Sequence, residues 1–183
     1  MAYTTINKST DYFNTKLYTG NGGTQSITGV GFQPDFTWIK TRSTTYKHIL
    51  VDAVRGATKH LSTVNTAAEI TNSDNVTAFA SDGFNLASDG NVNGNSETYA
   101  SWNWLANGAG SANTTGSINS TVSVNTTSGF SIVSYTGTGS NATVGHGLGV
   151  GPKMIYVKGR NTGSTNWLTG GTNISSNWGS SLH

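Results

Sequence analysis

The chain has 183 residues, its net charge at pH 7 is +2, and only 10% of its residues are charged. The scattered basic residues argue against a surface for nucleic acid or anionic membrane, and the absence of cysteine excludes disulfides and cysteine-based zinc sites. Thr, Ser, Asn and Gly supply more than half of the residues, and five Trp, seven Tyr and six Phe are available to build cores, so we expect a folded all-β protein.

We expect no targeting signal at the start of this sequence. The opening MAYTTINKSTDYF lacks the basic and apolar regions of a signal peptide, and no apolar stretch is long enough to cross a bilayer. We therefore expect synthesis in the cytoplasm without a signal peptide, and no membrane insertion. Residues 1–17 are predicted to be an N-terminal arm or leading strand, anchored by Tyr12 and Phe13.

Residues 18–106 are predicted to form one complete β-sandwich module. Alternating apolar residues after Pro34 predict an inner strand at Phe36–Lys40, and Ile49–Val51 predicts the next strand. Residues 57–69 are the one segment where we expect a helical turn.

Three further strands complete this module in the prediction. Val76–Ala80, Phe84–Ala87 and Thr98–Leu105 are separated by turns rich in Asp, Asn and Gly. In the last strand, Ala100, Trp102 and Trp104 alternate with smaller or polar residues, which predicts that these three form a buried face.

An internal repeat organises the remainder of the chain. The run Tyr18–Arg42 returns, in degraded form, as Tyr135–Arg160. The repeated skeleton consists of Gly, Pro and alternating apolar residues, and it extends the inner-strand prediction to Met154–Lys158. Carboxylates and histidines do not recur as sets, so the repeat indicates a duplicated building block rather than a duplicated active site.

The second copy is predicted to be incomplete. Residues 107–117 contain no aromatic residue and no aliphatic residue larger than Ala, which predicts a linker. Residues 118–183 then begin a partial second module. Because half a sandwich exposes an apolar face and unpaired strand edges, we expect the chain to be the start of a longer polypeptide, rather than a domain completed by neighbouring subunits.

One loop has the spacing of a calcium site. Asp89, Asn91, Asn93 and Asn95 place oxygen ligands at alternate positions, with Gly94 sixth as in a calcium loop. The twelfth position, where a bidentate Glu belongs, is Ala100, and no helix is expected on either side. A turn rich in Asp, Asn and Gly between strands explains the same residues.

The sequence gives only weak evidence for a catalytic site. His48 and Asp52 are predicted to share a strand face, but no nucleophile elbow accompanies them, and a structural ion pair at a strand end is the favoured interpretation. Trp167 and Trp178, in polar surroundings, are candidates for a glycan-stacking platform. Two tryptophans that anchor a thin core would give the same sequence.

Several strings in the chain resemble a known family. KLYTGNGGTQSI, DAVRGATK, TYASWNWLANG and VGHGLGVGPKMIYVK are similar to the repeated β-rich module of tail proteins of marine bacteriophages, described as tail-fibre-like or lectin-like. The resemblance covers nearly the whole chain. It implies a jelly-roll-like or lectin-like β-sandwich, a role in virion structure and host-surface contact, and no catalytic residue.

On this resemblance we expect a non-enzymatic virion protein, namely a proximal tail fibre or tail-associated adhesin located in the tail. Its expected partners are other copies of itself in a homotrimer, other tail proteins bound through the N-terminal arm, and a host surface glycan. No cofactor is expected apart from the candidate calcium. The alternatives are a head decoration protein and a polysaccharide depolymerase, although Glu69, Glu97 and the dispersed Asp residues do not suggest a catalytic pair.

Overall fold

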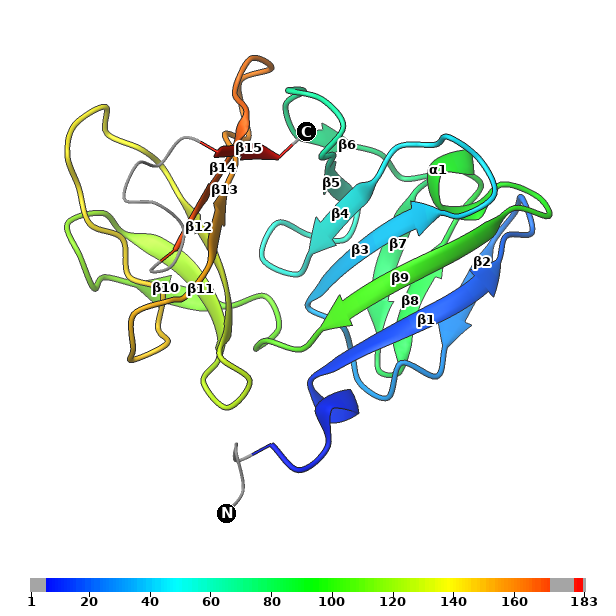
Figure 1. Ribbon diagram of the computed structural model, residues 1–183, viewed down its shortest axis with the longest axis horizontal. Helices are drawn as coiled ribbons and strands as arrows, with labels where there is room; N and C mark the ends of the chain where they lie inside the picture. The colour runs from blue at the N-terminus through cyan, green and yellow to red at the C-terminus, as the bar shows by residue number, and fades with distance from the viewer. Residues whose placement is uncertain (1–5, 172–179, 183) are drawn as a thin grey trace.

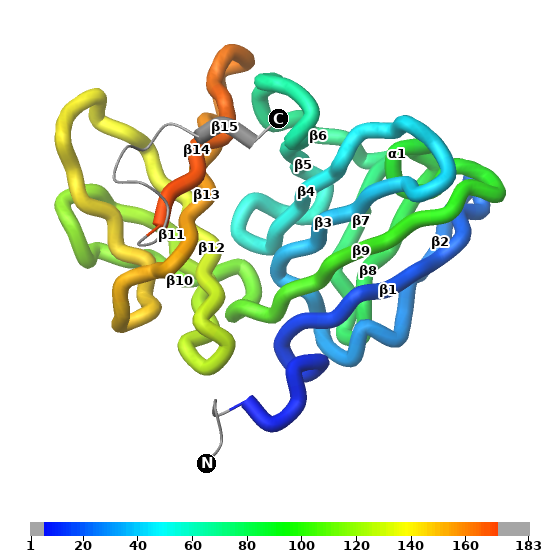
Figure 2. Tube along the Cα trace, viewed as in Figure 1, coloured from blue at the N-terminus to red at the C-terminus, as the bar shows by residue number. Residues whose placement is uncertain are grey.

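The computed structural model describes residues 6–171 and 180–182, which form an all-β protein with two lobes (Figure 1). The first lobe comprises residues 6–106 and the second begins at residue 107; the chain passes from one to the other after β9 (Figure 2). The strands of the first lobe are β1 (Phe13–Thr19), β2 (Gln25–Thr28), β3 (Phe36–Thr41), β4 (Ile49–Asp52), β5 (Lys59–Leu61), β6 (Ile70–Thr71), β7 (Val76–Ala80), β8 (Gly83–Leu86) and β9 (Thr98–Trp104). Those of the second are β10 (Ser111–Asn113), β11 (Ser120–Asn125), β12 (Phe130–Tyr135), β13 (Ile155–Val157), β14 (Trp167–Gly170) and β15 (Ser180–Leu182).

The first lobe is an antiparallel β-sandwich, as the sequence predicts. A six-stranded sheet of order β1-β9-β3-β4-β5-β6 faces a three-stranded sheet of order β2-β8-β7. Its core contains Ile39, Val51, Phe84 and Tyr99, all fully buried. Each such side chain contributes about 1.5–3 kcal/mol relative to an exposed position.

The burial prediction for β9 is right for Ala100 and wrong for the two tryptophans. Ala100 is buried, but so are Tyr99, Ser101 and Asn103 on the other face, completely, whereas Trp102 and Trp104 are partly exposed. The small polar residues are tolerated inside because their hydrogen bonds are satisfied; Asn103 Oδ1 accepts from Thr37 Oγ1 at 3.1 Å. The alternation of residue types along β9 identified the two faces of the strand. Because other elements cover both faces, this pattern could not show which face is more deeply buried.

Two local predictions for the first lobe differ from the structure. The segment 57–69 contains strand β5, which pairs with β4, instead of a helical turn. Its residues His60 and Leu61 are buried against β4, and this packing outweighs weak local preferences. The calcium-like loop contains a one-turn helix, α1 (Gly90–Asn93), where none was expected; a 3-10 turn, η1 (Ser9–Asp11), precedes β1.

The second lobe contains two three-stranded antiparallel sheets, β10-β11-β12 and β13-β14-β15. Strand β10 lies inside the segment 107–117 that was predicted to be a linker. It pairs with β11 through its backbone, and such pairing needs no large apolar side chain. The linker prediction failed here because it considered side-chain burial alone.

The repeat that is visible in the sequence is also visible in the structure, as matching side-chain contacts show. Lys40 Nζ donates to the carbonyl of the following residue at 2.8 Å, and Lys158 Nζ does the same at 3.1 Å. At equivalent positions of β1 and β12, Asn14 and Ser131 each donate to a carbonyl of the following glycine-rich loop, although the two acceptors, Val30 and His146, are not equivalent in the repeat. Strands β12 and β13 are thus the counterparts of β1 and β3.

The counterparts differ in their sheet positions. Strand β3 is an inner strand, as predicted, with β9 on one side and β4 on the other. Strand β13 pairs with β14 but lies at the edge of its described sheet, which corrects the inner-strand prediction for Met154–Lys158. The described residues contain no counterpart of β9 between β12 and β13.

Candidate functional site

The two lobes meet through the outer face of the six-stranded sheet. Trp167 of β14 packs on Leu50 and Leu61, beside Phe36 and Trp38, and only 8% of its surface is exposed. Its indole Nε1 donates to the Ser62 carbonyl at 2.8 Å. This tryptophan anchors a core, so its ring is not available for stacking on a sugar.

The second tryptophan of the predicted platform, Trp178, lies outside the described residues. No glycan platform is therefore assembled within the part of the chain that the structure describes. The alternative interpretation of the sequence, in which a tryptophan anchors a thin core, fits Trp167.

A chain of charged side chains also joins the lobes. Asp52 at the end of β4 pairs with Arg55, and Arg55 Nη1 lies 3.1 Å from Glu69 Oε2. Glu69 then accepts two hydrogen bonds from Arg160, from Nε and from Nη2, each at 3.0 Å. Arg160 Nη1 in turn donates to Ser134 Oγ of β12 at 2.8 Å. The network therefore runs from the first sheet to the second lobe.

Electrostatics favour the ionised form of Glu69. Burial raises the pKa of Glu69, but the hydrogen bonds from Arg160 and Arg55 outweigh burial and lower the pKa below its usual value. The hydrogen bonds that Arg160 donates to Glu69 raise the pKa of Arg160 against the opposing effect of burial. A carboxylate held between two guanidinium groups is a poor proton donor, so this cluster is suited to holding structure rather than to acid catalysis.

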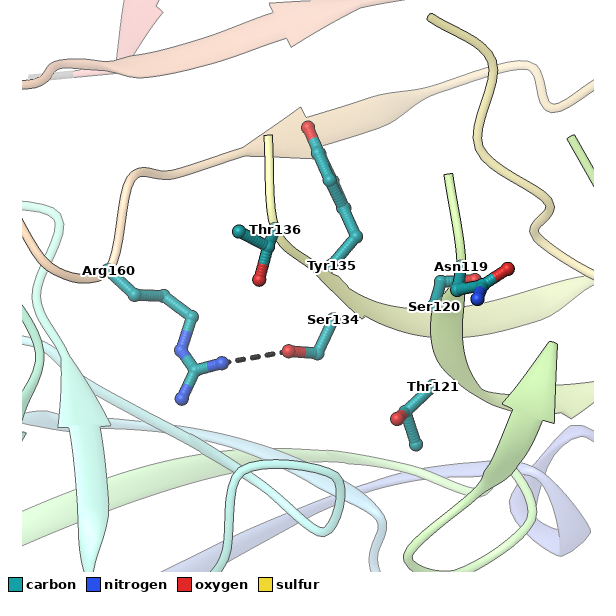
Figure 3. Close-up of a pocket in the computed structure, with 7 residues that line it drawn as sticks. All are labelled: Asn119, Ser120, Thr121, Ser134, Tyr135, Thr136 and Arg160. Carbon is teal, nitrogen blue, oxygen red and sulfur yellow. Dashed lines mark hydrogen bonds between the residues drawn. The ribbon is translucent and has the colours of Figure 1, made fainter. Parts of the chain in front are cut away.

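An open surface pocket of about 310 Å³ lies beside Arg160, and Figure 3 shows the side chains that line it. In that view, Ser134 of β12 lies between Arg160 and Thr121 of β11. The lining offers hydroxyl, amide and guanidinium groups, which suit a polar or backbone-like ligand. The lining residues are Asn119, Ser120, Thr121, Ser134, Tyr135, Thr136 and Arg160.

Sequence reasoning did not identify this pocket. Its only available signal was the repeat, which aligns Tyr135 and Arg160 with Tyr18 and Arg42 of the first copy. In the first lobe, Tyr18 stacks on Tyr99 with ring centroids 5.0 Å apart. In the second lobe, Tyr135 is 42% exposed.

The calcium-like loop forms a capped turn. Asp89 Oδ1 accepts from the backbone N and Nδ2 of Asn91, and Asp89 Oδ2 accepts from Asn72 and Asn75. Asn93 is fully buried and donates to the carbonyls of residues 23 and 87. Asn95 is exposed. The four candidate oxygens therefore have different surroundings and do not form one ligand set.

The types of side chain available as metal ligands lead to the same conclusion about the calcium-like loop. Among residues 6–171 and 180–182, no group of three or more His, Asp or Glu side chains could hold a metal ion. Both oxygens of Asp89 already accept hydrogen bonds from N–H donors, which a cation would have to displace. The residues present do not fit a calcium site.

His48 and Asp52 do not form a catalytic pair. His48 Nδ1 accepts from Trp38 Nε1 at 2.8 Å, while Asp52 pairs with Arg55. The ion pair at this strand end therefore joins Asp52 to Arg55, and His48 takes no part in it.

A second histidine lies beside a smaller cavity of about 180 Å³, which Lys47 and Asp89 also line. Burial lowers the pKa of His60, and its Nδ1 has no hydrogen-bond partner among the described residues. The imidazole is therefore neutral near pH 7. The lining includes one hydroxyl group, that of Ser62, whose Oγ accepts a hydrogen bond from Val64 N.

Comparison with known proteins gives one match. A family model described as "Domain of unknown function (DUF7483)" matches residues 8–182. No curated protein and no solved structure matches the chain. Within the described residues, no helix has both the length and the apolar character needed to span a membrane.

Proposed function

The chain belongs to the DUF7483 domain family, and from its resemblance to tail-fibre-like modules we propose that it is a structural protein of a bacteriophage virion. In this proposal it forms the proximal part of a tail fibre or a tail-associated adhesin. It contributes to host attachment by spacing and presenting binding modules, and it carries out no chemical reaction.

The single observation that carries this proposal is the fixed junction between two copies of one module. Trp167 fills an apolar site on the first lobe, and Arg160 binds Glu69 across the junction through two hydrogen bonds. A fibre transmits force and keeps its modules in register, so it needs a junction of this kind. Catalytic domains joined by a flexible linker do not need such a fixed junction.

The state of the carboxylates favours a structural protein over a depolymerase. Glu69 is held by two arginines, Asp52 pairs with Arg55, and Glu97 accepts from Ser43. Glycoside hydrolysis needs two carboxyl groups facing one bond, one of which has a raised pKa. The pKa of Glu69 is lowered instead.

The assembly and partners follow the same proposal. A homotrimer supplies the closed symmetric interface that a fibre axis requires. The N-terminal arm connects the protein to other tail proteins, and several copies convert weak contacts with a host surface glycan into firm attachment. The location in the virion tail rests on the resemblance alone.

The decisive experiment is antibody labelling of purified particles of the phage that encodes this chain, viewed by electron microscopy. Label at tail fibres or the tail tip, in a few copies per particle by quantitative mass spectrometry, is the expected result. Label spread over the capsid in high copy number would overturn the tail assignment and favour a head decoration protein. Complete absence from particles would overturn the virion role, and pre-immune serum provides the background control.

A further inference from the structure

The dipeptide Asn-Gly occurs three times in the chain, at Asn21, Asn93 and Asn107. In this dipeptide the backbone nitrogen of the glycine can attack Cγ of the asparagine side chain, and glycine has no Cβ to hinder the approach. Asparagine is counted among the thermolabile residues of proteins for this reason. Which of the three asparagines reacts in the folded chain depends on what holds its amide group and the following backbone nitrogen.

Asn93 is held in the core of the first lobe. Its side chain is fully buried, and Nδ2 donates to Asn21 Oδ1 and to the carbonyls of residues 23 and 87. The backbone nitrogen of Gly94 donates to the Tyr99 hydroxyl at 2.7 Å. Attack would require these hydrogen bonds to break in a place that water does not reach, so the structure protects Asn93.

Asn21 is exposed, but hydrogen bonds fix both of the groups that would react. Its Nδ2 donates to the Thr24 carbonyl at 3.0 Å, and its Oδ1 accepts from Gly23 N at 2.9 Å. The backbone nitrogen of Gly22 donates to the Asn93 carbonyl at 2.9 Å. This N–H therefore points at another segment of the chain rather than at the side chain of Asn21.

Asn107 has none of this protection. Its side chain is exposed, and among residues 6–171 and 180–182 no hydrogen bond involves that side chain or the backbone nitrogen of Gly108. Gly108 has φ +62°, and no atom lies within 4 Å of the position that a Cβ would take there. The space around the two reacting groups is therefore open.

We propose that Asn107 is a site of spontaneous deamidation, in which water is the second reactant. The Gly108 nitrogen gives up its proton and bonds to Asn107 Cγ, the Cγ–Nδ2 bond breaks, and ammonia leaves. Water then opens the resulting succinimide ring. Cleavage of the bond from the Gly108 nitrogen to Cγ gives aspartate, and cleavage of its bond to the backbone carbonyl carbon gives isoaspartate. Nothing is oxidised or reduced, and each product carries a carboxylate in place of a neutral amide.

The site lies where the chain crosses from one lobe to the other, after β9 and before β10 (Figure 2). Two contacts tie this crossing to β11: Asn107 N donates to Ser123 Oγ at 2.8 Å, and Ser111 pairs with Val122. Isoaspartate inserts one extra backbone carbon between these ties. The backbone of Gly110 already lies so close that a Cβ there would be 2.7 Å from the Val122 carbonyl oxygen. We therefore expect isoaspartate to weaken the pairing of β10 with β11.

The test compares the folded full chain with the same chain in denaturant, both incubated at mildly alkaline pH. Chymotrypsin cleaves after aromatic residues and leucine, so it releases the three asparagines in three different peptides for mass spectrometry. In the folded chain Asn107 should convert at least about tenfold faster than Asn21 or Asn93, the factor that about 1.4 kcal/mol of hydrogen bonding supplies. In denaturant this difference should disappear, because all three share the same dipeptide.

A matched pair of variants shows whether Asn107 accounts for the modified protein. Asn107→Gln should stop the acidic form from accumulating on ion-exchange chromatography, because the longer side chain cannot close the same ring. Asn21→Gln, at a hydrogen-bonded Asn-Gly, should leave its accumulation unchanged. Asn107→Asp adds the charge without lengthening the backbone, so its β10 amides should exchange hydrogen more slowly than those of the isoaspartate fraction.

Several results would overturn this inference. They are no conversion of Asn107 in the folded chain, conversion of Asn21 or Asn93 at an equal or higher rate, and undiminished acidic product from Asn107→Gln. Equal exchange at β10 in the isoaspartate fraction and in Asn107→Asp would overturn the structural consequence. The comparison of folded and denatured wild type needs no variant to fold. The inference does not rest on the virion role, so either proposal can fail without the other.

Discussion

Arg160 and Glu69 lie 91 residues apart in the chain and form a two-bond ion pair across the junction of the two lobes. The glutamate side chain is 13% exposed and the arginine side chain 37% exposed. The pair therefore combines a nearly buried acceptor with a partly solvated donor. Because the exposed fractions of the two side chains differ, removing Glu69 and removing Arg160 should lower the free energy of unfolding by different amounts.

The first prediction concerns this ion pair. Glu69→Gln should lower the free energy of unfolding by about 2–3 kcal/mol, because it leaves the buried Arg55 with one partner fewer. Arg160→Gln should cost about 1 kcal/mol or less, because solvent screens a partly exposed charge. Urea unfolding followed by tryptophan fluorescence measures both, and the double variant gives their coupling energy. Lys8→Gln, at the exposed Lys8–Asp11 pair, is the neutral control; a larger loss for Arg160→Gln than for Glu69→Gln would refute this account.

The second prediction concerns acid stability. The pKa of Glu69 is lowered in the folded state, because the hydrogen bonds from Arg160 and Arg55 outweigh the effect of burial. Its contribution is therefore fully present above the unfolded value of about 4.3, and it is lost as pH falls through the folded pKa. Glu69→Gln should be less stable than the wild type at pH 7, and the difference should shrink below about pH 4. Chemical unfolding from pH 7 to pH 3 measures this; a constant difference would contradict it.

The third prediction concerns a close backbone approach in the smaller sheet of the first lobe. Gly83 has φ +151°, and a Cβ at this position would lie 1.9 Å from the carbonyl oxygen of Ile27. Gly83→Ala should therefore cost at least about 3 kcal/mol or prevent folding, because β8 would have to move away from β2. Gly108→Ala is the matched control, since φ there is +62° and no atom lies within 4 Å. We expect thermal unfolding to show a loss of about 1 kcal/mol for the control, and equal losses would refute the steric argument.

The fourth prediction concerns Asp89 and calcium. Asp89→Ala should destabilise the protein by about 2 kcal/mol, because it removes the cap of α1 and leaves Asn72 and Asn75 without their acceptor. Added calcium should leave the melting temperature of the wild type unchanged, because both carboxylate oxygens already accept hydrogen bonds. A calcium-dependent rise in Tm that disappears in Asp89→Ala would restore the metal-site interpretation.

The fifth prediction concerns the apolar half of the junction. Trp167→Ala should cost about 3–5 kcal/mol as a large-to-small core substitution. Trp167→Phe keeps an aromatic ring and loses mainly the hydrogen bond to the Ser62 carbonyl, so its cost should be nearer 1 kcal/mol. Calorimetry measures both. If glycan binding were changed by Trp167→Phe with no change in stability, the core assignment of this residue would be wrong.

The sequence predicted most strands of the first lobe, because each combines apolar alternation with a Gly, Asp or Asn turn. Phe36–Lys40, Val76–Ala80 and Thr98–Leu105 all correspond to observed strands. It did not predict β5 or β10, because these short strands depend on backbone pairing with a neighbour. It also did not connect Glu69 with Arg160, because nothing in a local pattern links charges so far apart.

By itself, the sequence determined that the chain is β-rich and built from two related copies, because turn residues and alternation are local properties that survive in each copy. Only the tertiary structure decided which faces and edges are covered. Trp102 was predicted to be buried, yet Ser101 lies deeper, and Trp167 is a core anchor because a sheet from the other lobe lies against it. Burial depends on what packs on a strand, and that is decided by residues far away in the chain.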